Sequence, residues 1–368
     1  LIIAAAWFFY KTKNAAPTPF DKAPYEEEPA LRAKKPRLRM VPAAESGIDF
    51  VNTIAETAEN NILKNTNFYN GGGVAVADIN NDGLPDLFFI NCDGKNALYL
   101  NQGKLKFKNI TAGSGLDSGD NFETAVTAAD VNGDGYLDFY VCCAGPFPPE
   151  KRRNKLYINN KNLTFTESAA AYGLDNAGMS TGANFFDYDL DGDLDLYLLN
   201  YPTTFEYASK IEADMDPATG NFKPRLKPKS EFDSDRLYRN DSPPQPSLQG
   251  GRKGSFKDVS KEAGILNFAY GLSVSISDFN ADGWPDIYVG NDFIQPDILY
   301  INNKNGTFSG IPPSIPWEPI CPTLTTTAAS TCSPSTCCPS AITARKPPPP
   351  PTRSPATTRW CNTATSNP

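Results

Sequence analysis

A nine-residue motif occurs four times in the chain and decides the fold that we predict. The copies are DINNDGLPD (Asp78–Asp86), DVNGDGYLD (Asp130–Asp138), DYDLDGDLD (Asp187–Asp195) and DFNADGWPD (Asp278–Asp286). Every copy has Asp at positions 1, 5 and 9, Asp or Asn at position 3, and Gly at position 6. A motif that returns at intervals of 52, 57 and 91 residues indicates a repeat architecture.

A second block of sequence follows each copy of the motif. The blocks are NALYLN from Asn96, NKLYIN from Asn154, DRLYRN from Asp235 and DILYIN from Asp297. A Phe follows each block, and in three copies a Gly comes eight residues after that Phe, at Gly115, Gly173 and Gly264. The end of one more unit, MVPAAESGI from Met40, precedes the first motif.

Each repeat contains four short runs with the composition of β-strands. In the first copy they are GVAVADI, DLFFIN, ALYLN and KFKNIT, which are rich in β-branched and aromatic residues and bounded by Gly, Asn and Asp. Four strands in a unit of about 40 to 60 residues is the period of a propeller blade. We therefore predict an all-β fold, a β-propeller of four-stranded blades over residues 39–310. A small closed ring and an incomplete arc both remain open.

The acidic motif has the composition of a calcium-binding loop. Calcium takes about six to eight oxygen ligands, and short side chains at positions 1, 3 and 5 of a tight loop turn toward one centre. Gly at position 6 allows the turn, while a backbone carbonyl at position 7 and the carboxylate at position 9 complete the shell. We predict about four structural Ca²⁺ ions. The predicted ligands are Asp78, Asn80, Asp82, Leu84, Asp86, Asp130, Asn132, Asp134, Tyr136, Asp138, Asp187, Asp189, Asp191, Asp193, Asp195, Asp278, Asn280, Asp282, Trp284 and Asp286.

The motif has two other interpretations. An EF-hand needs an acid at position 12, where this chain has Phe89, Val141, Leu198 and Val289. A metal-free turn is the second alternative, because Asp, Asn and Gly are good turn residues by themselves. The same ninth residue in four copies favours metal, and four Ca²⁺ ions would balance the net charge of -8.

The composition also limits the function. The acidic balance, with 42 Asp and Glu against 34 Lys and Arg, argues against nucleic acid as a partner. Histidine is absent, which excludes Ser-His and Cys-His nucleophiles and the commonest zinc ligand. We predict no catalytic residues, no bound organic cofactor and no enzymatic activity.

The two ends differ from the repeats. Residues 1–10 (LIIAAAWFFY) have the character of part of a signal peptide or anchor, and residues 11–38 of a linker. Residues 311–368 are a low-complexity tail, interpreted as disordered or aberrant. Five of the eight cysteines lie in that tail, and no disulfide framework or zinc pattern is recognised.

With these residues in place, the chain resembles the FG-GAP/VCBS repeat proteins, whose DxDxDGxxD calcium loops recur in the propeller of integrin α subunits. The LYxN blocks between the loops make it more similar to bacterial secreted proteins of the cartilage-acidic-protein type. That group also carries an ASPIC/UnbV domain, which is not seen in these residues. The resemblance implies a protein that is secreted, periplasmic or on the cell surface and binds calcium. It also implies adhesion or binding of an extracellular protein or glycan, with membrane contact only through an N-terminal anchor.

Alternation of connections predicts where a ligand binds. In an up-and-down blade, the turns between strands 1 and 2 and between strands 3 and 4 share one face. The connections between strands 2 and 3 share the other face with the blade-to-blade connections. We interpret Cys142–Arg153 and Tyr201–Ser234 as connections between strands 2 and 3, and expect ligand recognition on the longer one, which is aromatic and basic. A solvated insertion, a calcium-containing propeller enzyme acting on polysaccharide, and a truncated non-functional product are the alternatives.

Overall fold

The computed structural model describes most of the repeat region. It covers residues 39–311 apart from 66–67, 117–120, 203–212, 216–221, 225–232, 242–254, 266 and 293–295. The predicted signal and linker segments lie outside the described residues, as does the tail beyond Ile311. Contacts divide the chain into Leu1–Gly47 and Ile48–Pro368, and the second unit contains all the sheets.

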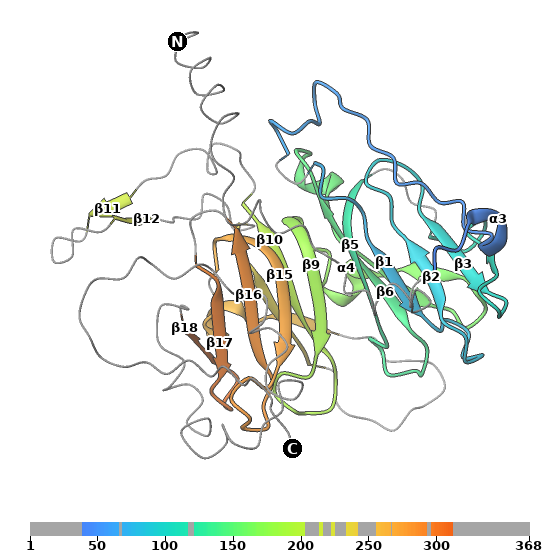
Figure 1. Cartoon of the computed structure of the whole chain (residues 1–368). Coiled ribbons are helices and arrows are strands. Elements are labelled where there is room, and N and C mark those ends of the chain that lie inside the picture. The colour runs from blue at the N-terminus through green and yellow to red at the C-terminus, as the bar shows by residue number, and fades with distance from the viewer. Residues whose placement is uncertain are drawn as a thin grey trace, which may run out of the picture. The chain divides into compact units, whose positions relative to one another are not determined.

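Four antiparallel four-stranded sheets, which we call blades 1 to 4, make up the described repeats (Figure 1). Blade 1 consists of β1 (Val74–Ala77), β2 (Asp86–Phe89), β3 (Ala97–Asn101) and β4 (Phe107–Asn109). Blade 2 consists of β5 (Phe122–Ala129), β6 (Asp138–Ala144), β7 (Lys155–Asn159) and β8 (Phe165–Glu167). Blade 3 consists of β9 (Met179–Phe186), β10 (Asp195–Tyr201), β13 (Arg236–Asn240) and β14 (Phe256–Asp258). Blade 4 consists of β15 (Tyr270–Ser277), β16 (Asp286–Asp292), β17 (Ile298–Asn302) and β18 (Phe308–Ile311).

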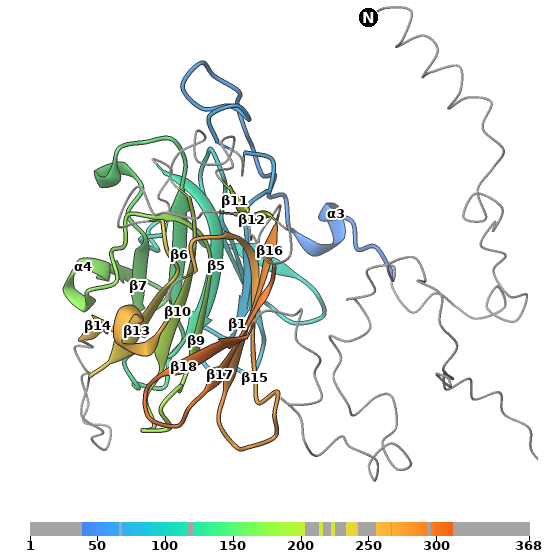
Figure 2. The same ribbon diagram turned by 90° about the vertical axis from the view of Figure 1, so that its left-hand side faces the viewer.

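The strands of each blade pair in the order in which they occur along the chain. The ninth residue of each motif is the first residue of the second strand and pairs with the last residue of the first, as in Ala129 with Asp138. The predicted all-β fold with four-stranded propeller blades is therefore confirmed. The first strands β1, β5, β9 and β15 lie side by side in that order, with β1 and β15 at the two ends of the series (Figures 1 and 2).

Blade 3 carries an insertion between its second and third strands. Within it, β11 (Ala213–Met215) and β12 (Phe222–Pro224) form a two-stranded antiparallel hairpin. The rest of the proposed ligand segment between Thr203 and Phe232 lies outside the described residues. The corresponding connection of blade 2 holds a short 3-10 helix, Pro149–Lys151.

Single-turn helices mark the ends of repeats. They are α3 (Ala43–Ser46) at the end of the partial repeat before the first motif, and α4 (Ala169–Tyr172) and α6 (Ser260–Ala263) after blades 2 and 3. Each ends at a Gly in the left-handed region, which a Gly adopts without steric cost. A Cβ on Gly173 would lie 2.8 Å from the Phe256 carbonyl oxygen of the next blade. This close approach explains why Gly recurs eight residues after the Phe.

The core lies between the blades. Alternate residues of a second strand face opposite neighbours: in β6, Phe139 and Val141 pack against blade 1, whereas Tyr140 and Cys142 pack against blade 3. Because both faces are buried, every residue of β6 and β10 is apolar or hydrogen-bonded inside the protein. Face-to-face packing of this kind fixes the position of each loop relative to the next.

Both predicted connections between second and third strands are shorter than the sequence suggested. Tyr201 is the last residue of β10 and is buried against Tyr270, so the connection of blade 3 begins after Tyr201 and not at it. Cys142 and Cys143 lie within β6, so the connection between β6 and β7 begins after Ala144 and not at Cys142. Both thiols are fully buried, and burial raises the pKa of Cys143 to about 12. Together with buried Cys92 they are free thiols within the described part of the chain. Their role is packing, because a buried, protonated thiol is a poor nucleophile.

Candidate metal loops

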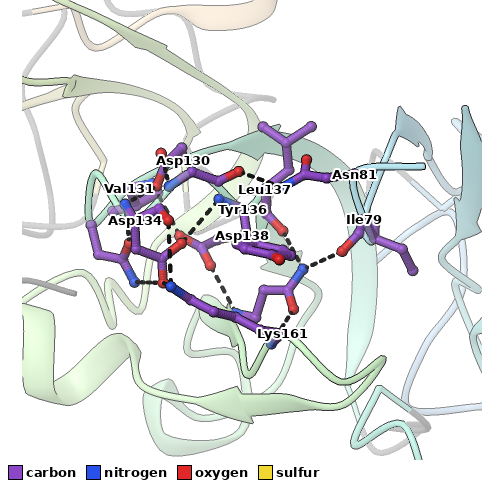
Figure 3. A network of polar contacts seen from close by, with 12 residues as sticks. Ile79, Asn81, Asp130, Val131, Asp134, Tyr136, Leu137, Asp138 and Lys161 are labelled. Carbon is purple, nitrogen blue, oxygen red and sulfur yellow. Dashed lines mark hydrogen bonds and ion pairs between the residues drawn. The ribbon is translucent and has the colours of Figure 1, made fainter. Parts of the chain in front are cut away.

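Each predicted loop is the turn between the first two strands of its blade. In the loop of blade 2, the Asp130 carboxylate accepts hydrogen bonds from the Asp134 N–H (2.9 Å) and the Gly135 N–H (2.8 Å) (Figure 3). The same pair of bonds closes the other three loops. Residues four and six of every loop have positive φ, which aims successive N–H groups at the first Asp. Local chemistry therefore builds the turn.

The ninth residue ties its loop to the third strand. The two oxygens of Asp138 accept the N–H groups of Val131 (3.0 Å) and Asn159 (2.8 Å), which come from the loop and from the end of β7. Asp86, Asp195 and Asp286 make the matching pairs of bonds. All four Asp residues are at most 1% exposed. The recurrent ninth Asp thus has a structural role that does not depend on metal.

Three of the four loops are also closed by their third residue. In blade 2, the Asn132 amide oxygen accepts from the Asp134 N–H (3.0 Å), and its amide nitrogen donates to the Asp134 carboxylate (3.3 Å). Asn80 and Asn280 make the same two contacts with Asp82 and Asp282. In these loops, part of the predicted ligand set is already engaged in internal hydrogen bonds.

The loop of blade 3 differs, because its third residue is Asp189. One ligand oxygen each from Asp187, Asp189 and Asp195 lie within 4.8 Å of one another, which is the one such cluster found among the described residues. The Asp189 Oδ1 atom is shielded from solvent and has no hydrogen-bond partner. Burial and the neighbouring Asp191 and Asp187 carboxylates raise the pKa of Asp189. A divalent cation fits this donor set, since it would neutralise the repulsion and give the orphan oxygen a partner.

The structure does not bring the whole predicted ligand set together. Asp191 and Asp193 of blade 3 are outside the convergent group, and the acids of the other three loops do not form one by the same measure. At position 7, the N–H of Leu84, Tyr136, Asp193 or Trp284 donates to the fifth residue. The metal-binding role of these carbonyls, and of the other predicted ligands, stays a prediction.

Burial sets the protonation of the ninth residues. It raises the pKa of Asp138 to about 7 and that of Asp195 to about 8, against the hydrogen bonds from the backbone that lower them. Burial also raises the pKa of Asp86 and Asp286. The protein thus tolerates these acids most easily when they are protonated or when a cation lies beside them.

The sequence interpretation missed the Asn that ends each LYxN block. The Asn159 amide nitrogen donates to Leu137 O in its own loop (3.2 Å) and to Ile79 O in the loop of blade 1 (2.9 Å). The Asn302 amide nitrogen likewise donates to Pro285 O in its own loop and to Tyr188 O in the loop of blade 3. The signal was present, because Asn ends all four blocks. Its meaning depends on packing between blades, which the pattern does not contain.

A second recurrent cap lies at the opposite end of the blades. The residue before each third strand accepts a backbone N–H from the end of the second strand: Asn154 accepts from Cys143 (2.8 Å), and Asp235 from Asn200 (2.8 Å). Asn96 and Asp297 make the equivalent bond in blades 1 and 4. The Tyr197 hydroxyl also donates a hydrogen bond to the Asp235 carboxylate (2.8 Å). Burial raises the pKa of Asp235 to about 7.

Repeated four-stranded blades joined by acidic, Gly-containing turns define a propeller-type repeat protein. A model of the FG-GAP-like repeat matches residues 60–141, 144–198 and 278–331, together more than half of the chain. The chain therefore belongs to the FG-GAP-like repeat family.

Integrin α chains are similar to part of this chain. Integrin alpha-8 of Gallus gallus is 32% identical over 149 residues, covering 36% of this chain and 14% of the integrin. Integrin alpha-8 of Mus musculus is 30% identical over 149 residues, with the same coverage. Integrin alpha-6 of Gallus gallus is 34% identical over 144 residues, covering 36% of this chain and 13% of that integrin. The alignments thus span a small part of each integrin.

Within the described part of the chain, no helix combines the length and the apolar character that crossing a bilayer requires.

Proposed function

We propose that this protein is a ligand-binding repeat scaffold, exported from the cell, in which calcium acts as a structural ion and not as a catalyst. The observation that carries the calcium part is the convergence of the Asp187, Asp189 and Asp195 carboxylates, one of which, Asp189, has an Oδ1 atom without a hydrogen-bond partner. Membership of the FG-GAP-like family and the similarity to integrin α chains support the scaffold part.

Calcium in such a loop would join strands that hydrogen bonds already connect. Asp187 and Asp189 precede β10, while Asp195 is its first residue and also binds the end of β13 through the Asn240 N–H. An ion held by these carboxylates would therefore link the first, second and third strands of blade 3. Because the unfolded chain lacks the site, its binding free energy would add to the folding free energy.

The face opposite the loops is the proposed ligand site. Lys161, in the turn between β7 and β8, contacts Asp134 in the loop of blade 2. This contact is expected if the turns between strands 1 and 2 and between strands 3 and 4 lie on one face. At the other end, the Asn154 and Asp235 N–H groups donate to Asn176 and Asn267 in the blade-to-blade connections. These contacts support the alternation from which we propose ligand binding, by a protein or glycan, on the connection of blade 3 that follows Tyr201 and ends before β13.

Calcium titration of the full-length, chelator-treated chain by isothermal calorimetry tests the metal part. We expect uptake of about four ions and a rise in melting temperature of several degrees at saturation. No uptake, or a melting curve that is the same in calcium and in excess chelator, would reject the structural calcium.

A loop replacement tests the ligand part. Residues 203–232 are replaced by a short Gly/Ser turn, and the binding of labelled protein to a glycan array and to surface-protein extracts is compared with that of the wild type. We expect the variant to keep its calcium uptake and melting temperature while losing binding. Retained binding by the folded variant would contradict the proposed face.

A further inference from the structure

Lysine side chains lie on the acidic loops of blades 2 and 4. Lys161 and Lys304 occupy the same place in their repeats, two residues after the last residue of the third strand. The Lys161 Nζ is 3.4 Å from the Asp134 Oδ2, and the Lys304 Nζ is 3.3 Å from the Asp282 Oδ2 (Figure 3 shows the first pair). In both loops the contacted carboxylate is the fifth residue, which is a predicted calcium ligand.

The backbone holds each lysine in this position. Lys161 and Lys304 have φ of 65° and 63°, a left-handed conformation that is uncommon for a residue with a side chain. Their N–H groups donate to the side-chain oxygens of Asn159 (2.8 Å) and Asn302 (2.9 Å), the residues that end the LYxN blocks. The turn is thus fixed to the same Asn that bridges neighbouring loops.

Each ammonium group makes more than one contact with its loop. Lys161 also donates to the Asp134 carbonyl (3.4 Å) and lies 5.1 Å from the centre of the Tyr136 ring. Lys304 donates to the Asp282 carbonyl (3.3 Å). The Asp134 side chain is 7% exposed although the Lys161 side chain is 41% exposed. The ammonium is therefore hydrated on one side and covers the carboxylate on the other.

The other two loops lack this contact among the described residues. In blade 1 the equivalent turn has Gly103 and Lys104, and no ion pair joins Lys104 to Asp82. In blade 3 the nearby cation is Arg239, whose guanidinium is hydrogen-bonded to Asp241 at 2.6 Å. Its charge opposes the rise in the pKa of the third residue, Asp189, but it makes no ion pair with the fifth residue, Asp191, among the described residues. The loop of blade 3 also has Asp189 where the loops of blades 2 and 4 have Asn132 and Asn280.

We propose that Lys161 and Lys304 set the calcium affinities of their loops by holding an ammonium group against the fifth-position carboxylate. This inference rests on the calcium binding proposed above. The ammonium supplies part of the positive charge when the loop is empty, and it repels the ion when calcium enters. The loops of blades 2 and 4 are therefore the weak calcium sites and keep their shape without metal, whereas the loop of blade 3 is the strong site.

Substitution by Met, which keeps the length of the side chain and removes its charge, tests the proposal. Calcium titrations compare the wild type with Lys161→Met and Lys304→Met, with Lys104→Met as the matched control in blade 1. We expect each of the first two variants to tighten one weak site by about three- to tenfold, because a half-exposed charge near a divalent ion acts through a high effective dielectric. The control should leave all affinities unchanged.

Two further measurements separate charge from packing. Lys161→Arg keeps the charge and should retain the wild-type affinity, and in excess chelator Lys161→Met should melt below the wild type. A lysine that only packs against the loop would give weaker or unchanged calcium binding when removed, never tighter binding. Unchanged affinities in a folded Lys161→Met protein that takes up calcium would overturn the lysine proposal alone. A wild type that takes up no calcium would overturn the proposed calcium function and this inference together.

Discussion

In blade 2 the third residue of the acidic loop is Asn132 and the residue before β7 is Asn154, whereas blade 3 has Asp189 and Asp235 at these two positions. The backbone bonds are the same in both blades: Cys143 donates to Asn154 and Asn200 donates to Asp235, each at 2.8 Å. An amide and a carboxylate can fill the same position because both offer an acceptor oxygen to a backbone N–H.

The difference between the two blades lies in charge. The amides of blade 2 complete their hydrogen bonds inside the protein. The acids of blade 3 have raised pKa values and leave the Asp189 Oδ1 without a partner. The comparison teaches that one repeat framework accommodates amides at these two positions in blade 2 and, in blade 3, acids that a cation or a proton would stabilise. Three experiments test this contrast.

The largest effect is expected from the ninth residues, which the two blades share. Asp138→Ala and Asp195→Ala each leave two backbone N–H groups without acceptors, Val131 and Asn159 in the first case. We expect each variant to lower the free energy of unfolding by about 2–4 kcal/mol in excess chelator. Urea denaturation monitored by circular dichroism measures the loss. If the loss occurs only in the presence of calcium, the ninth residue acts through metal and not as a link between strands.

The second effect is a pH dependence that Asp235 adds in blade 3, beyond that of the ninth residues, which both blades share. The pKa of Asp235 is raised to about 7 because the carboxyl is buried, although the Asn200 N–H, the Asn267 amide and the Tyr197 hydroxyl act against this. A raised pKa means that the folded protein binds the proton more tightly than the unfolded chain. Its contribution to stability is therefore complete below the unfolded pKa, near 4, and is lost as the pH rises through about 7.

Exchange of the two residues tests that dependence. Asp235→Asn should reduce the fall in stability between pH 5 and pH 8 by about 2 kcal/mol. Asn154→Asp should introduce a similar fall in blade 2, because the site receives the Cys143 N–H in the same way. Thermal melts are compared at both pH values in the same calcium concentration. Parallel pH profiles for the wild type and Asp235→Asn would show that Asp235 does not carry the effect.

The smallest effect is expected at the third loop residue. Asp189→Asn converts the loop of blade 3 to the pattern of blade 2 and removes one carboxylate from the convergent group. We expect the tightest calcium site to weaken by about five- to tenfold, since ligand charge tunes affinity. Calorimetric titration measures this, with Asn132→Asp as the reciprocal variant that should strengthen the loop of blade 2. If Asp189→Asn leaves the affinity of the tightest site unchanged, that site lies in another loop.

The sequence predicted the fold and the position of the loops well because both depend on short-range patterns. Gly83, Gly135, Gly192 and Gly283 turn each loop through positive φ, and alternating apolar residues place the second strands between two neighbours. The ninth Asp was predicted as a ligand from its recurrence. The structure gives that recurrence a second cause, a pair of backbone hydrogen bonds to the loop and to the third strand.

By itself, the sequence determined four β-blades with an acidic turn in each, since turn chemistry and strand composition act over a few residues. Only the tertiary structure decided which turns have an unsatisfied acid, which have a lysine, and which acids are buried. Asp189 and Asn132 occupy the same place in the motif, yet their surroundings come from residues such as Lys161 and Arg239, which lie 29 and 50 residues further along the chain. Burial and electrostatics sum over such distant neighbours, and a local motif does not specify them.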